Sequence, residues 1–218
     1  MFLVMEEKNM SIMAPPQTYT RLPTVSVAGS PLFQISVKQY HEMIEQGILT
    51  TNDRVELLNG LLVLKMSQKA PHARMMTRLM FLFVKILPKG FLPRLQLPIT
   101  LSGSEPEPDA AIVRGKESTY ELRHPVPTDF GLVVEVSDTT LRYDRLEKGP
   151  TYAAAGLPEY WIINIEAEQL EVYTQPMEDG YLQMETYDLG DSVPLVLDGQ
   201  LIGVVSVAEL FGRDAVAT

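Results

Sequence analysis

The chain has 218 residues, of which 45% are hydrophobic and 21% are charged, and these proportions are ordinary for a soluble globular protein. It contains no cysteine, which excludes disulfide bonds, thiolate catalysis and cysteine-based metal sites. The formal net charge of −10 argues against non-specific binding of nucleic acid by the surface as a whole.

The beginning of the chain has little pattern that predicts structure. Residues 1–30 are rich in methionine, contain proline and lack hydrophobic periodicity, so we expect a disordered segment followed by a single domain over residues 31–218. The apolar run at Met1 is too short for a signal peptide, and the most apolar later segment is too short to span a bilayer. We therefore expect a cytoplasmic protein that does not associate with membranes.

The first predicted elements are a helix, a hairpin and a second helix. Apolar residues at helical spacing lie between Ser36, a suitable N-cap, and Gly47, a suitable stop. Asn59-Gly60 separates two apolar runs, which is the strongest short signal for a hairpin. Pro71 can begin the second helix, which we expect to reach about Leu87.

The rest of the chain predicts several strands and few helices. Pro98 favours a sheet edge for a strand over residues 95–101. A helix is expected over residues 144–155, and Pro150 implies that it either starts near Gly149 or is bent there. Further strands are expected around Asp109 and Glu135 and over residues 159–165, 169–174, 181–187 and 193–197, before a short helix over residues 206–211. This order predicts an α/β (α+β) fold with a central mixed β-sheet flanked by helices.

Two of these strands carry one carboxylate each, Asp109 and Glu135. The run Leu132 to Val136 is typical of a strand that is buried on both faces, where an ionised acid is costly. Two such acids on neighbouring strands would also repel each other, and a bound divalent cation removes both problems. Hard oxygen ligands favour Mg²⁺ or Mn²⁺. The alternative is that each acid lies at a strand end and is solvated.

Basic residues are concentrated in the first half of the chain. No acidic residue occurs between Glu56 and Glu105, and the formal charge is +5 through residue 104 and −15 after it. This asymmetry predicts a surface for a polyanion, to which Lys69, Arg74 and Arg78 would contribute phosphate contacts. A solvated helix face is the alternative explanation.

The motifs taken together resemble the PD-(D/E)XK nuclease superfamily, and more closely the Uma-type family of putative restriction endonucleases. The resemblance runs in order over residues 35 to 175. It rests on residues 54–60, His72, Glu107-Pro108-Asp109, residues 133–137, residues 143–148, Tyr152-Ala153 and residues 156–161. It implies a restriction endonuclease-like core with a central mixed sheet.

Position by position, the resemblance implies that Asp109 and Glu135 are metal ligands. The lysine that usually follows the second acid by two positions is replaced here by Ser137, and Lys148 matches a lysine that has moved onto the next helix. The alternative for Lys148 is a surface lysine that pairs with Asp144, one turn earlier.

Two further residues belong to the matching segments. Glu56 is a candidate third acid, which would bind the metal directly or through water, or would instead order the Asn59-Gly60 turn. His72 would contact phosphate or tune the site, or would make only a local hydrogen bond at the start of its helix.

The sequence therefore predicts a Mg²⁺-dependent endonuclease that hydrolyses DNA and uses no small-molecule cofactor. A homodimer is expected of an enzyme that must cut two strands. The alternative is a catalytically inactive nuclease-fold module that binds nucleic acid or protein, which the missing lysine at Ser137 and the net acidity support.

Overall fold

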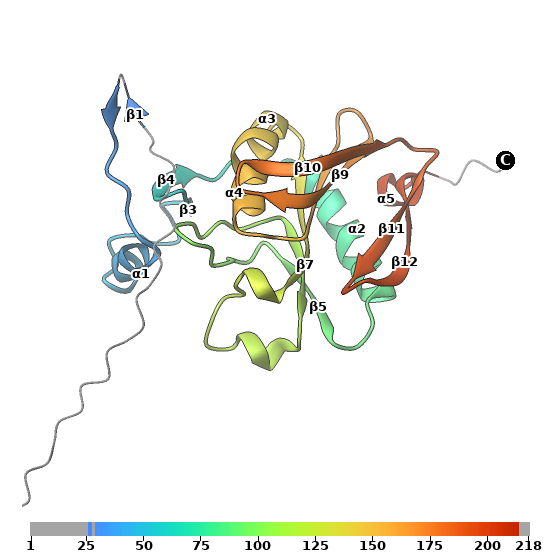
Figure 1. Cartoon of the computed structure of the whole chain (residues 1–218), viewed down its shortest axis with the longest axis horizontal. Coiled ribbons are helices and arrows are strands. Elements are labelled where there is room, and N and C mark those ends of the chain that lie inside the picture. The colour runs from blue at the N-terminus through green and yellow to red at the C-terminus, as the bar shows by residue number, and fades with distance from the viewer. Residues whose placement is uncertain (1–25, 28, 214–218) are drawn as a thin grey trace, which may run out of the picture.

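The computed structural model describes residues 26–27 and 29–213 (Figure 1). The predicted disordered segment, residues 1–30, lies largely outside the described residues. Within the described part, no helix combines the length and the apolar character that crossing a bilayer requires.

The described chain contains five α-helices, two 3-10 helices, one π-helical turn and twelve strands. The helical elements are α1 (Val37–Glu45), α2 (Ala70–Ile86), η1 (Glu117–Tyr120), η2 (Pro127–Asp129), α3 (Leu141–Tyr143), the π-helical turn η3 (Asp144–Lys148), α4 (Gly149–Ala154) and α5 (Val207–Phe211). The strands are β1 (Ser26–Val27), β2 (Ser30–Pro31), β3 (Val55–Leu58), β4 (Leu61–Leu64), β5 (Phe91–Leu95), β6 (Ala110–Arg114), β7 (Phe130–Ser137), β8 (Glu159–Asn164), β9 (Gln169–Met177), β10 (Gly180–Tyr187), β11 (Ser192–Leu197) and β12 (Gln200–Ser206).

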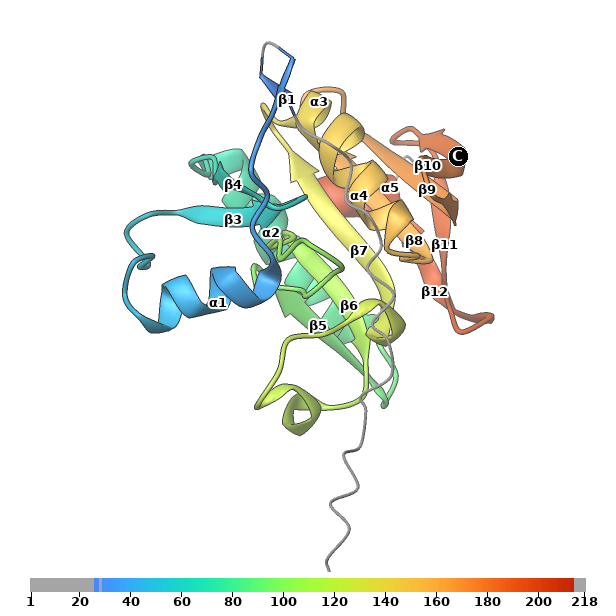
Figure 2. The same ribbon diagram turned by 60° about the vertical axis from the view of Figure 1, so that its left-hand side comes forward.

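A six-stranded mixed sheet in the order β10-β9-β8-β7-β6-β5 forms the centre of the fold. Every neighbouring pair is antiparallel except β7 and β8, which are parallel, with Glu135 opposite Ile162. A parallel pair needs a crossover that returns the chain to the same end of the sheet. The helical segment α3–η3–α4 is that crossover, and it lies along β7 and β8 (Figure 2). The predicted fold class is confirmed.

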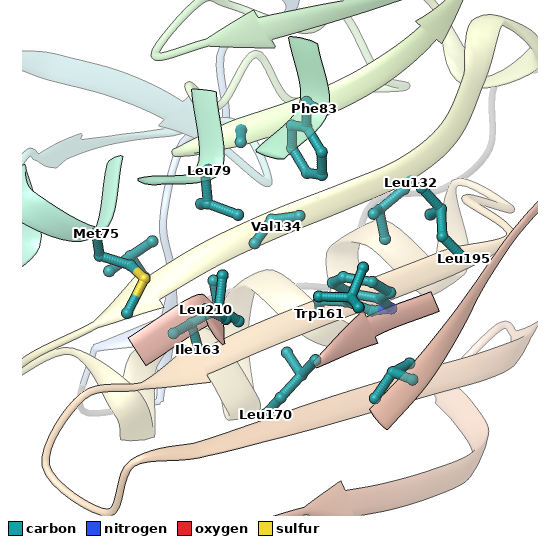
Figure 3. Close-up of a cluster of buried hydrophobic side chains, with 14 of the residues drawn as sticks. Met75, Leu79, Phe83, Leu132, Val134, Trp161, Ile163, Leu170, Leu195 and Leu210 are labelled. Atoms are coloured by element: carbon teal, nitrogen blue, oxygen red, sulfur yellow. The ribbon is translucent and has the colours of Figure 1, made fainter. Parts of the chain in front are cut away.

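Alternating residues of β7 divide the core between the two faces of the sheet. Leu132 and Val134 face α2 and pack with Leu79, Phe83 and Trp161 (Figure 3). This face is also covered by α5 and the β11–β12 hairpin, which lie beside α2 (Figure 1). The opposite face lies under the crossover and has its own core of ten buried residues: Ile99, Leu101, Ala111, Val113, Phe130, Val133, Tyr152, Leu157, Tyr160 and Ile162.

Local signals explain the first three elements after residue 35. Ser36 caps α1 in a reciprocal capping box with Gln39, as its side chain predicted. Asn59 and Gly60 have φ values of 50° and 76°, the left-handed conformation that a two-residue hairpin turn requires. Gly60 also approaches Gln34 closely, because an added Cβ would lie 2.6 Å from the Cβ of Gln34.

The structure corrects two expected boundaries and adds a strand. The edge strand is β5, at residues 91–95, because the chain leaves it in a turn where Gln96 has φ 51°. The crossover begins at Leu141 and widens into a π-helical turn, in which the Gly149 N–H bonds to the carbonyl of Asp144, immediately before Pro150. Strand β12 was not predicted, although Asp198-Gly199 before it is a hairpin signal.

A half-buried acid in β8, Glu159, gives the fold a testable pH dependence. Burial raises the pKa of Glu159 to about 7, against the opposing effect of the Trp161 indole N–H, which donates to Oε1 over 2.6 Å. The folded protein therefore binds a proton at pH values where the unfolded chain does not, and stability is lost as the pH rises towards about 7. Glu159→Gln keeps an acceptor for Trp161 and carries no charge. We expect it to be more stable than wild type by about 2 kcal/mol at about pH 8 and unchanged at about pH 4.

Urea denaturation at the two pH values measures this difference. Asp179→Asn, which removes an exposed carboxylate after β9, is the control and should show no such difference. An equal effect of Glu159→Gln at both pH values would contradict the assignment.

Candidate active site

Six of the eight side chains predicted to form the site line one cavity of about 130 Å³. They come from five different parts of the fold, and they are Glu56, Lys69, His72, Asp109, Glu135 and Lys148. The cavity lies between the β3–β4 hairpin, the start of α2, the strands β6 and β7, and the crossover.

Glu135 projects from β7 towards the crossover and is only 2% exposed. Its Oε1 accepts hydrogen bonds from Lys148 Nζ over 2.9 Å and from the Tyr152 hydroxyl over 2.7 Å. Burial raises the pKa of Glu135 well above its usual value, and Asp109 and Asp144 raise it further while Lys148 opposes them. The Glu135 carboxyl is thus held among one cation and two further carboxyl groups, at a position with almost no contact with solvent.

Lys148 is buried at the end of the π-helical turn. Its Nζ also lies 3.8 Å from Glu56 Oε1, so the ammonium group lies between two carboxylates. Burial alone would lower the pKa of Lys148, but the charges of Glu135, Glu56 and Asp144 outweigh burial and raise it. Lys148 therefore stays protonated at neutral pH, and it is not the surface lysine of the alternative interpretation.

Asp109 lies immediately before β6 and is held from two sides. Its Oδ2 accepts a hydrogen bond from the backbone N–H of Val136 over 2.8 Å, which ties it to the neighbouring strand. Its Oδ1 lies 3.0 Å from Nε2 of His72, in the first turn of α2. The other ring nitrogen of His72 is buried and has no hydrogen-bond partner among the described residues. Asp109 is thus the residue that His72 contacts in this structure.

Glu56 is fixed by the loop that leads into β6. Its Oε2 accepts a hydrogen bond from the backbone N–H of Glu107 over 3.0 Å, and its Oε1 accepts one from the Tyr143 hydroxyl over 3.4 Å. The hairpin is tied to the same loop because Glu105 N donates to the carbonyl of Leu57 over 2.7 Å. Glu56 therefore also connects the β3–β4 hairpin to the loop before β6, in addition to any effect on the Asn59-Gly60 turn.

Ser137, which stands where the resemblance predicts a lysine, has a structural partner. The hydroxyls of Ser137 and Thr140 both donate to Asp144 Oδ2, each over 2.6 Å. Burial raises the pKa of Asp144, against the effects of Lys148 and of these hydroxyl groups. Asp144 is thus held by β7 and the crossover.

The sequence interpretation missed two tyrosines at this site. Tyr152 lies four residues after Lys148, and that spacing on one helical face was the signal that could have found it. Tyr143 lies five residues before Lys148, and only the wider π-helical turn brings its ring to 6.0 Å from Lys148 Nζ. No regular helical spacing would have indicated that pair.

The predicted phosphate contacts lie in two different places. Lys69 is at the cavity, 3.5 Å from Asp138. Arg74 and Arg78 lie further along α2 and donate to the backbone carbonyls of Phe211 and Leu210 over 3.2 and 3.3 Å. The structure therefore does not bring these two arginines to the cavity.

The charges around the cavity suit a divalent cation. Six carboxylates line it, against three lysines, and each lysine lies near a carboxylate. The acids are Glu56, Glu107, Asp109, Glu135, Asp138 and Asp144. Within the described residues, no three His, Asp or Glu side chains gather closely enough to hold an ion by themselves. Mg²⁺ is commonly held by one or two carboxylates and keeps several waters, so the donor set fits such an ion.

Comparisons with known proteins identify the family and the fold. The family model described as Uma2, putative restriction endonuclease, matches residues 37–204. The fold is similar to the crystal structure of a putative nuclease belonging to DUF820 from Anabaena variabilis ATCC 29413, with a TM-score of 0.59 and 17% sequence identity. The similarity covers 78% of this chain and 97% of the other. No curated protein sequence matches the chain.

The buried pair between Lys148 and Glu135 predicts a pH-dependent effect on stability. Lys148→Met leaves Glu135 without its cation, and breaking a buried pair in this way costs about 3 kcal/mol or more. We expect that loss at about pH 8 and a smaller one at about pH 5, because Glu135, whose pKa is raised, becomes neutral as the pH falls.

Urea denaturation of the variant at both pH values measures the effect. Adding Glu135→Gln to Lys148→Met should recover most of the stability at the higher pH. Lys69→Met, which breaks an exposed pair with Asp138, is the matched control, with an expected change below about 0.5 kcal/mol. A pH-independent loss in Lys148→Met would show that ionisation of Glu135 does not set the cost of losing Lys148.

Proposed function

Because the chain belongs to the Uma2 family of putative restriction endonucleases, we propose that it is a nuclease that hydrolyses phosphodiester bonds of DNA with Mg²⁺ or Mn²⁺. The observation that carries this proposal is the shared cavity of Asp109, Glu135 and Lys148, in which Lys148 Nζ lies 2.9 Å from the buried Glu135 Oε1. Two carboxylates and a lysine in one cavity are the groups that metal-assisted attack of water on a phosphate requires.

Asp109 and Glu135 are the proposed metal-binding residues. Both hydrogen bonds that Glu135 accepts go to Oε1, and Asp109 is oriented by Val136 and His72. When bound, the cation would lower the pKa of a water molecule and neutralise charge on the phosphate. The protein's part is to hold the two carboxylates in place before the ion and the substrate arrive.

Lys148 is the proposed donor to the reacting groups. Because it stays protonated at neutral pH, it does not act as a base. Its Nζ can donate hydrogen bonds to the attacking water or to the phosphate oxygens as negative charge develops on them. The Tyr152 hydroxyl shares Glu135 Oε1 with Lys148, so it limits the movement of the carboxylate when the lysine turns to substrate.

Glu56 and the basic side chains have supporting parts in this proposal. Glu56, whose Oε1 lies 3.8 Å from Lys148 Nζ, is a third acid that would hold the cation through a water molecule, since no three acids among the described residues gather closely enough to bind an ion directly. Lys69, which is 61% exposed, would contact a phosphate at the cavity rim. Arg74 and Arg78 would first have to leave the α5 carbonyls, so we propose no phosphate contact for them. A homodimer would present two such cavities to the two strands of a duplex.

Loss of either carboxylate should strongly reduce cleavage and remove metal binding. We expect Asp109→Asn and Glu135→Gln each to lower the rate of DNA cleavage in Mg²⁺ by about 100-fold or more, because even the loss of an outer partner of a metal ligand costs about 10- to 100-fold. Mn²⁺ titration by calorimetry should lose its binding heat in both variants. Circular dichroism shows whether each variant is folded.

The control for both variants is Asp179→Asn, an exposed acid on the β9–β10 turn, which should cleave and bind Mn²⁺ as wild type does. Cleavage that persists in folded Asp109→Asn would overturn the proposed mechanism. A wild-type protein that binds DNA equally with and without divalent cations, and never cleaves it, would instead be a nuclease-fold binding module.

A further inference from the structure

An apolar groove of about 490 Å³ adjoins the catalytic cavity. It lies between β4 and the crossover, which are neighbours in both views (Figures 1 and 2). Leu64, Met66 and Leu146 line it with exposed fractions of 73%, 65% and 57%. Large apolar side chains that are exposed together usually mark a binding surface.

The groove is continuous with the cavity that holds Asp109 and Glu135. Five of its nine lining residues also line that cavity: Leu64, Met66, Thr139, Thr140 and Tyr143. Tyr143 connects the two spaces directly, because it lines both of them and its hydroxyl donates to Glu56. A ligand with one part at the carboxylates therefore has its adjoining part in the groove.

The guanidinium group of Arg142 at the groove could bind a phosphate. Arg142 is exposed and lines the groove, and it makes no hydrogen bond or ion pair with any other described residue. Glu147 also lines the groove, so a phosphate is expected on the side of Arg142. An apolar floor next to an unpaired guanidinium matches a nucleotide, which presents a flat apolar base beside an anion.

We propose that this groove binds an unpaired nucleobase of the DNA strand whose phosphate enters the catalytic cavity. The inference rests on the proposed function. Proteins that take a base out of a duplex hold it between apolar or aromatic side chains, which Leu64, Leu146 and Tyr143 supply here. A base that is stacked in an intact duplex cannot enter the groove, so the protein prefers single strands or frayed ends. A second copy of the chain seated on the same residues would instead cover the mouth of the cavity.

The test is a binding measurement by fluorescence anisotropy, made in Ca²⁺ in place of Mg²⁺. The probes are a labelled oligothymidylate of about 12 nucleotides and a blunt duplex of the same length. Wild type should bind the single strand more tightly than the duplex. Leu64→Gln combined with Leu146→Gln should weaken single-strand binding by about tenfold and duplex binding by less than about twofold.

The matched control is Leu182→Gln combined with Leu201→Gln, which changes leucines that are 69% and 64% exposed on β10 and β12, outside the groove. It should leave both affinities unchanged. Arg142→Gln, at an exposed position that should not affect folding, should lower the salt dependence of single-strand binding by about 0.7 in log–log slope.

Each other outcome overturns the inference in a recognisable way. Single-strand binding that is unchanged in the groove variant, or that falls equally with duplex binding, removes the base site and leaves the proposed nuclease function standing. A wild type that binds neither probe overturns both. A change of molecular mass in the groove variant, measured by light scattering, would assign the groove to an interface between copies of the chain.

Discussion

The parallel pairing of β7 with β8 is the constraint on which the candidate site depends. Parallel neighbours cannot be joined by a tight turn, so the chain must cross over one face of the sheet before β8 begins. That crossover covers the face of β7 from which Glu135 projects, and it carries Lys148 and Tyr152 to the same carboxylate oxygen. The arrangement of the candidate site is thus a consequence of topology as much as of the residues themselves.

The cluster around Lys148 is an expensive arrangement for a core to contain. Two charges removed from water rarely recover the whole cost of desolvation, and an apolar pair of similar size is often as stable. Here burial raises the pKa of Glu135 and that of Asp144, and the neighbouring Asp109 carboxylate raises both further. Lys148 does not neutralise all of the negative charge of these acids, and a divalent cation would neutralise the rest. The electrostatic cost of the cluster is therefore consistent with the proposed metal binding.

Part of this site could be predicted from local signals in the sequence, whereas Glu56, His72 and Lys148 were predicted from the resemblance to the family. The buried apolar strand around Glu135 and the Asn59-Gly60 turn beside Glu56 follow from pattern and turn chemistry. The contact between Lys148 and Glu56 could not be predicted, since it depends on how the hairpin meets the crossover. The partners of Arg74 and Arg78 could not be predicted either. The same basic residues on a helix face can contact solvent, phosphate or, as here, the backbone carbonyl groups of α5.

The position of Lys148 explains how the site can contain a lysine although residue 137 is serine. A side chain at position 137 is on the same strand as Glu135 and two residues on, so the two share a face of β7. The crossover begins four residues after β7, and its π-helical turn brings Lys148 to 2.9 Å from Glu135. Ser137 instead binds Asp144, at the start of that turn, over 2.6 Å. The hydroxyl of Ser137 on β7 therefore helps to hold the π-helical turn that carries Lys148.

A lysine at both position 137 and position 148 would place two ammonium groups in one buried space and would leave Asp144 without this hydroxyl donor. The exchange of lysine for serine and the widened helical turn are two parts of one arrangement.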